Sequence, residues 1–68
     1  MATETKRQQA IRSGVANAHQ SVTDNDMTRE DAMRLLSDFV QDGLSSAGIK
    51  NDIPTKADMR LARILASF

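Results

Sequence analysis

The single histidine of the sequence precedes two aspartates, and such a trio is able to bind a metal ion. His19 stands five residues before Asp24 and seven before Asp26. Imidazole nitrogens and carboxylate oxygens are both metal ligands. One histidine in a chain without cysteine rarely builds a site, because structural zinc sites draw most of their ligands from these two residue types. We therefore expect His19 to be an ordinary, partly exposed residue near a helix end, and we predict no metal and no cofactor.

The acidic segment that starts at Asp24 also has the alternating oxygen groups that open a calcium-binding EF-hand loop. The sixth position of such a loop is a glycine that makes a sharp turn, and the twelfth is a glutamate that binds the ion through both oxygens. Arg29 and Leu35 occupy these positions here. A polar loop followed by a helix N-terminus accounts for the same residues. The sequence therefore predicts no calcium site.

Residue types that carry out catalysis are scarce in this chain. It has no cysteine, no glycine-rich phosphate-binding loop and no serine in a nucleophile elbow. A chain of 68 residues with two aromatic side chains also has too thin a core to enclose a pocket. We expect a protein that is not an enzyme and that has no small-molecule substrate.

The charge balance limits the partners that bulk electrostatics would attract. Nine lysines and arginines stand against nine aspartates and glutamates, so the formal net charge is zero and no global field holds a duplex or an anionic bilayer. The first twenty residues are polar and contain no apolar run of signal-peptide or membrane-spanning length. We expect a cytoplasmic protein that does not contact a membrane.

Apolar residues recur at spacings of three and four along the whole chain, and no stretch alternates in the manner of a strand. This pattern predicts an all-α protein, a small three-helix bundle in a single domain over residues 1–68. Polar turns separate the expected helices, which span about 3–22, 28–47 and 55–67.

Several residues indicate where these helices begin, end and pack. Thr28 and Thr55 are suited to cap the second and third helices, and Gly48 fits the left-handed position after the second. Gly43, inside the second helix, costs about 1 kcal/mol relative to alanine. The spacing of the third helix predicts one buried face, formed by Ala57, Leu61, Ile64, Leu65 and Phe68.

The expected apolar burial of so short a chain about equals its conformational entropy cost. We therefore expect the bundle to be completed by self-association or by a partner.

Small residues recur every four positions on the first helix, at Ala10, Gly14 and Ala18. Such a ridge lets another backbone approach closely. It packs either on the second helix of the same chain or on another copy or another protein, and a larger residue at Gly14 is disruptive in both cases. Under the second interpretation the candidate protein-interaction residues are Ile11, Gly14, Val15, Ala18, Leu36, Phe39 and Val40.

Basic residues form two strips, one on the first helix with Lys6, Arg7 and Arg12 and one on the third. The strip on the third helix comprises Lys56, Arg60 and Arg63, together with Lys50 just before this helix. One interpretation is that both strips are solvated faces beside an acidic middle helix. The other is that they contact phosphates. A helix-turn-helix does not fit, because the second helix is about twenty residues long and that motif has a short helix before its turn.

Two functional hypotheses follow. The leading one is a small non-catalytic protein–protein interaction module, a regulator, adaptor or inhibitor of a larger protein, of the size and type that phages and plasmids encode. It would act through helix faces, as a homodimer or on a protein partner. The alternative is a DNA-associated regulator that binds as a dimer through the basic strips, with Lys56, Arg60 and Arg63 as the nucleic-acid contacts.

Overall fold

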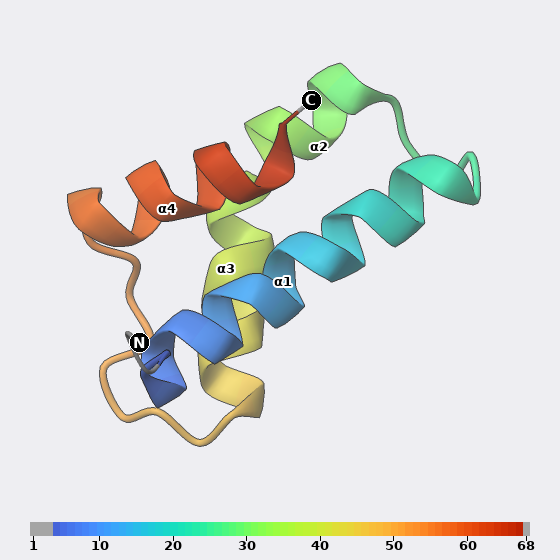
Figure 1. Cartoon of the computed structure of the whole chain (residues 1–68). Coiled ribbons are helices and arrows are strands. Elements are labelled where there is room, and N and C mark those ends of the chain that lie inside the picture. Colours follow the sequence, from blue (N-terminus) through green and yellow to red (C-terminus); the bar gives the residue numbers. More distant parts are fainter. Residues whose placement is uncertain (1–3, 68) are drawn as a thin grey trace.

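The computed structural model describes residues 4–67, and over that range the chain is all-helical. The prediction of an all-α fold is confirmed (Figure 1). None of the helices in residues 4–67 has the length and apolar character that crossing a bilayer requires. The expectations for residues 1–3 and for Phe68 lie outside the described residues. The helices are α1 (Lys6–Thr23), α2 (Arg29–Arg34), α3 (Leu36–Ser46) and α4 (Lys56–Ala66).

Three of the four helices start at a threonine, because its hydroxyl satisfies a backbone N–H that the helix itself leaves unpaired. Thr5, Thr28 and Thr55 each accept a hydrogen bond from the backbone N–H three residues later, at 3.1 Å in every case. Gln8 and Asp58 return the bond, since their side-chain oxygens accept the N–H of Thr5 and Thr55 at 2.9 Å. The predicted caps at Thr28 and Thr55 are confirmed.

The second predicted helix is broken at Leu35, so the expectation of one helix over 28–47 was wrong. Leu35 leaves helical geometry, with φ −95° and ψ 10°, and no side chain caps the helix that follows it. The break turns α2 so that it packs against α1 as well as α3. Ala32 and Leu36, on either side of it, are both buried. Neither proline nor glycine lies at the break, and the helical spacing of apolar residues continues across it. The sequence therefore did not indicate that the helix would be interrupted.

Helix α3 ends in the way that the sequence predicted, with a glycine in the left-handed conformation after its last turn. Gly48 adopts the left-handed conformation, with φ 76°. Its N–H donates to the carbonyl of Ser45 at 3.0 Å, and the N–H of Ile49 donates to the carbonyl of Leu44 at 3.1 Å. These two bonds form a Schellman motif, which satisfies the last carbonyls of the helix.

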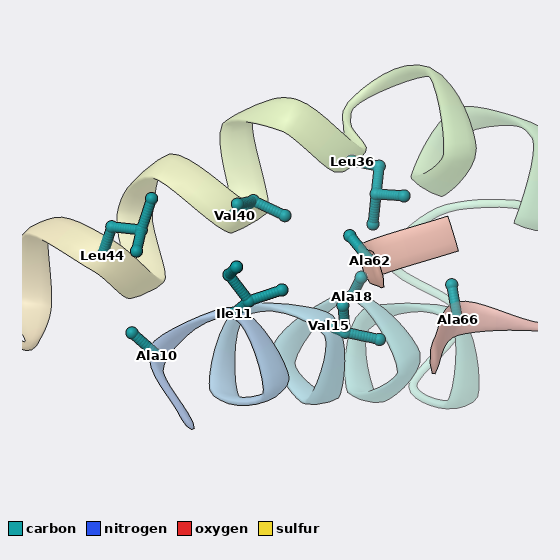
Figure 2. Packing of buried hydrophobic residues seen from close by; sticks show 9 residues of the cluster. All are labelled: Ala10, Ile11, Val15, Ala18, Leu36, Val40, Leu44, Ala62 and Ala66. Carbon is teal, nitrogen blue, oxygen red and sulfur yellow. The ribbon is translucent and has the colours of Figure 1, made fainter. Parts of the chain in front are cut away.

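The core lies where α1, α3 and α4 meet, which is consistent with a three-helix arrangement to which α2 is added. Figure 2 shows the apolar side chains of α1 and α3 pointing toward one another, with two alanines of α4 entering beside them. Among the fully buried side chains, the large aliphatic ones come from α1 and α3, and α4 contributes two alanines. Met59, Leu61 and Leu65 of α4 pack against this cluster but are only partly buried. The buried cluster comprises Ala10, Ile11, Val15, Ala18, Leu36, Val40, Leu44, Ala62 and Ala66.

Two glycines set the distance between α1 and α3. A β-carbon on Gly14 would overlap the carbonyl oxygen of Phe39 and lie 3.2 Å from the α-carbon of Val40. A β-carbon on Gly43 would overlap the carbonyl oxygen of Ala10 and lie 3.1 Å from the α-carbon of Gly14. These neighbours are backbone atoms, which cannot swing aside as a flexible side chain can. Both positions therefore require glycine so that the two helices can approach closely. Gly43 lowers helix propensity, but it also makes this packing possible.

The buried face of α4 differs from the predicted one. Ala62 and Ala66 are fully buried and Asp58 is 8% exposed, whereas Ile64 is 67% exposed and Ala57 is also exposed. Leu61 and Leu65 of the predicted face are half-buried against the core, as expected in part. The exposure of Ala57 and Ile64 shows that the predicted face was displaced by about one residue of helical rotation. The physical reason is that small alanines let α4 lie close to α1 and α3, and the same rotation brings Asp58 to an arginine of α1.

Candidate interaction surface

The seven residues predicted as a protein-interaction ridge come together in the structure, but inside the chain. Six of them are buried, and Phe39 is half-buried against the same cluster. Gly14 contacts the backbone of α3 directly. The ridge thus serves the packing of α1 on α3, which is the first of the two interpretations that the sequence left open. Contact between these residues and another protein would require α1 and α3 to separate.

An ion pair ties the start of α1 to the start of α4. Arg7 Nε lies 3.1 Å from both carboxylate oxygens of Asp58, and its second terminal nitrogen lies 2.5 Å from Oδ2. The guanidinium also donates to the backbone carbonyls of Asn51 at 2.7 Å and Ile53 at 3.3 Å. Asp58 Oδ2 accepts the N–H of Thr55 as well. One arginine therefore holds the linker between α3 and α4 together with the cap of α4.

The protonation of Asp58 reflects these contacts. The hydrogen bonds from Arg7 lower the pKa of the Asp58 carboxyl to about 2, against the opposing effect of its burial. The backbone and hydroxyl of Thr55 lower this pKa further. The sequence placed Arg7 in a basic strip that is either solvated or in contact with phosphates, and it did not connect this residue with Asp58. The two residues are 51 positions apart, and no local pattern connects them.

The basic strip of α1 is largely occupied by intramolecular contacts. Arg7 is paired with Asp58, and Arg12 donates to Glu4 Oε2 through Nε at 3.1 Å and through a terminal nitrogen at 2.5 Å. Only Lys6 of this strip makes no ion pair among residues 4–67. The two basic strips therefore differ in their capacity to bind phosphates. On α1, both arginines are already paired with carboxylates of the same chain.

The three cations of α4, which we call the α4 basic strip, are exposed and lie on one face. Lys56, Arg60 and Arg63 follow spacings of four and three. No ion pair or hydrogen bond engages their side chains within the described part of the chain. They share a shallow surface hollow with apolar neighbours. The hollow is lined by Pro54, Thr55, Lys56, Met59, Arg60, Arg63 and Ile64.

Beside this strip runs the apolar stripe that the sequence placed in the core. We call Ala57, Leu61, Ile64 and Leu65 the α4 apolar face. Ala57 and Ile64 are exposed, and Leu61 and Leu65 are half-buried at the edge of the core. Ile64 lies four residues after Arg60, so the apolar and basic side chains are neighbours on the helix surface.

A second shallow hollow continues from this face onto α1. It brings Leu65 of α4 next to Val15 and Ala16 of α1, with Arg12, His19, Gln20 and Thr23 around them. His19 Nε2 lies 2.6 Å from the carbonyl oxygen of Ala66, which accepts the bond. His19 thus closes the last turn of α4 onto α1. Within residues 4–67 no group of three or more histidine, aspartate and glutamate side chains is arranged to hold a metal ion.

No protein-family model matches this chain, and no curated protein or solved structure matches it. In residues 4–67, α4 presents the α4 basic strip, whose cations make no ion pair, beside the α4 apolar face. The core of the protein covers this apolar face only along the edge formed by Leu61 and Leu65.

Proposed function

We propose that the protein is a small non-catalytic interaction module that binds a larger protein through the α4 apolar face. The observation that carries the proposal is the orientation of α4, which buries alanines and leaves Ile64 67% exposed. In a chain with so few large apolar residues, such a side chain on a regular helix supports a role in binding. The form we propose is a cytoplasmic regulator, adaptor or inhibitor, of the type that phages and plasmids encode.

Energetics support a contact centred on Ile64. Burying an isoleucine side chain completely contributes about 1.5–3 kcal/mol, and two thirds of that area is still open in this chain. Leu61 and Leu65 have further area to cover. An apolar centre with a polar rim is the usual arrangement of a protein–protein interface. We propose that the partner, or a second copy, completes the marginal core at this edge.

The test is capture from a lysate of the native host, with nuclease present, using tagged variants that differ only at exposed isoleucines. Ile64→Ser removes the anchor of the α4 apolar face. Ile53→Ser is the matched control, because Ile53 is 68% exposed but lies in the linker before α4. We expect one protein to be retained in stoichiometric amount by the unmodified chain and by Ile53→Ser and to be lost with Ile64→Ser. Equal retention by all three forms would contradict the proposal.

A DNA-associated regulator is the second candidate, and one observation favours it. Lys56, Arg60 and Arg63 line the same hollow and have no partner within residues 4–67. Three phosphate contacts predict a slope of about −3 for log affinity against log salt concentration. Retention of nucleic acid that weakens with this slope and is lost in Arg60→Ala plus Arg63→Ala would support this candidate over the first. Salt-insensitive binding would argue against it.

A further inference from the structure

We infer that the segment which covers the α4 apolar face is an acidic amphipathic stretch of another protein, with carboxylates along the edge that meets the α4 basic strip. This inference rests on the proposed function, since it describes the partner of the same surface. It adds the chemistry of that partner and its orientation across α4.

The first support is the contrast between the arginines of α1 and the cations of α4. Arg7 and Arg12 each reach a carboxylate of their own chain. Lys56, Arg60 and Arg63 reach none among the described residues. Their positions at the border of the apolar face correspond to the rim of an interface. Opposite charges at a rim speed association and fix the register of the partner.

A second copy of this chain fits the surface less well. Two antiparallel α4 helices packed face to face would bring three cations of one copy beside three of the other, and like charges in such contacts are unfavourable. The acidic hollow on α3 has the complementary charge. It is lined by Asp38, Gln41, Asp42, Ser45 and Asp52, so it has no large apolar side chain to receive Ile64.

A nucleic acid would match the α4 basic strip but not the α4 apolar face. Phosphates would pair with the three cations, but the backbone of a duplex presents a mostly charged and polar surface, which is poorly suited to cover Leu61 and Ile64. The chain has no tryptophan or tyrosine on which an unpaired base would stack. An acidic amphipathic helix matches both rows at once, because side chains three and four positions apart share a face.

The experiment uses two synthetic helical peptides with identical leucine positions, one flanked by glutamates and the other by lysines. Each is titrated into the ¹⁵N-labelled protein while the backbone amide spectrum is recorded. We expect the glutamate peptide to shift amides of α4 and to bind about tenfold more tightly than the lysine peptide. We expect Arg60→Glu plus Arg63→Glu to abolish this preference and Ile64→Ser to weaken binding of the glutamate peptide. All three residues are exposed, so these variants should keep the fold.

Equal binding of the two peptides, or failure of the glutamate peptide to shift α4, would overturn the inference. So would sedimentation of the protein alone as a dimer that Ile64→Ser dissociates, because a second copy would then cover the face. Preferential shifts of α4 by a DNA duplex would overturn it in favour of nucleic acid. In the lysate experiment, capture that survives Ile64→Ser contradicts the proposed function. Capture lost in Ile64→Ser but kept in the charge-reversed variant contradicts only the acidic character of the partner.

Discussion

Gly14 of α1 and Gly43 of α3 meet where the two helices cross, so closely that a β-carbon on Gly43 would lie 3.1 Å from the α-carbon of Gly14. Each glycine also faces a carbonyl oxygen of the opposite helix. The helices therefore contact each other backbone to backbone, with Ile11 and Val40 buried nearby. This crossing positions α1, and α1 in turn provides the arginine that holds α4.

The first prediction concerns this crossing. We expect Gly14→Ala and Gly43→Ala each to lower the free energy of unfolding by about 1–3 kcal/mol, because the added carbon meets backbone atoms. Alanine favours a helix over glycine by about 1 kcal/mol, so the loss would occur despite better helix propensity. Urea unfolding followed by circular dichroism measures it. Ser13→Ala, an exposed change on the same helix, is the control. A gain in stability at either glycine would show that the helices are not in close contact.

The second prediction concerns the rotation of α4. We expect Ala62→Leu to destabilise the protein by about 1–3 kcal/mol, since Ala62 is fully buried. Ala57→Leu should change stability by no more than about 0.5 kcal/mol, because Ala57 is exposed. Thermal or urea unfolding of the two variants makes the comparison. If α4 instead buried the face predicted from the sequence, Ala57→Leu would be the damaging change of the two.

The third prediction concerns the ion pair between Arg7 and Asp58. The pKa of Asp58 is lowered to about 2 in the folded chain, so between this value and the ordinary one near 3.8 the unfolded state binds more protons. The stabilisation is therefore present above about pH 4 and is lost as the pH falls toward 2. We expect Asp58→Asn to lower the free energy of unfolding by about 2 kcal/mol at pH 7 and by little near pH 2.

The measurement is urea unfolding of both forms across this pH range. Asp42→Asn serves as the control, because Asp42 is exposed and makes no ion pair among residues 4–67. Its difference from the unmodified chain should stay small at every pH. A constant difference between Asp58→Asn and the unmodified chain from pH 7 to pH 2 would contradict the assigned role of the carboxylate.

Local chemistry made part of this fold predictable. Thr28 and Thr55 cap helices by accepting a hydrogen bond from the backbone N–H three residues later. Gly48 adopts its left-handed conformation within the single turn that ends α3. The break at Leu35 was not predictable in this way, since the residues around it are compatible with a continuous helix. It depends on how α2 packs against α1.

The candidate site depended still more on contacts between distant residues. The ridge containing Gly14 predicted a close helix contact, but only the structure shows that Gly43 of the same chain completes it. On α4, the large apolar residues indicated a core face around Ile64. Because Ala62 is small, α4 packs close to the other helices on that side. Asp58 on the same side binds Arg7, which is 51 positions away in the sequence. These two contacts give α4 a different rotation from the predicted one.

The central claim is that the partner lies on the α4 apolar face, and site-specific photocrosslinking in the native host tests it most directly. A photoreactive phenylalanine derivative replaces Ala57, which is exposed on this face, or Ser45, which is exposed on α3. We predict a discrete crosslinked protein from position 57 that disappears when Ile64→Ser is added, and none from position 45. Crosslinking from position 45 alone, or from position 57 regardless of Ile64, would contradict the claim.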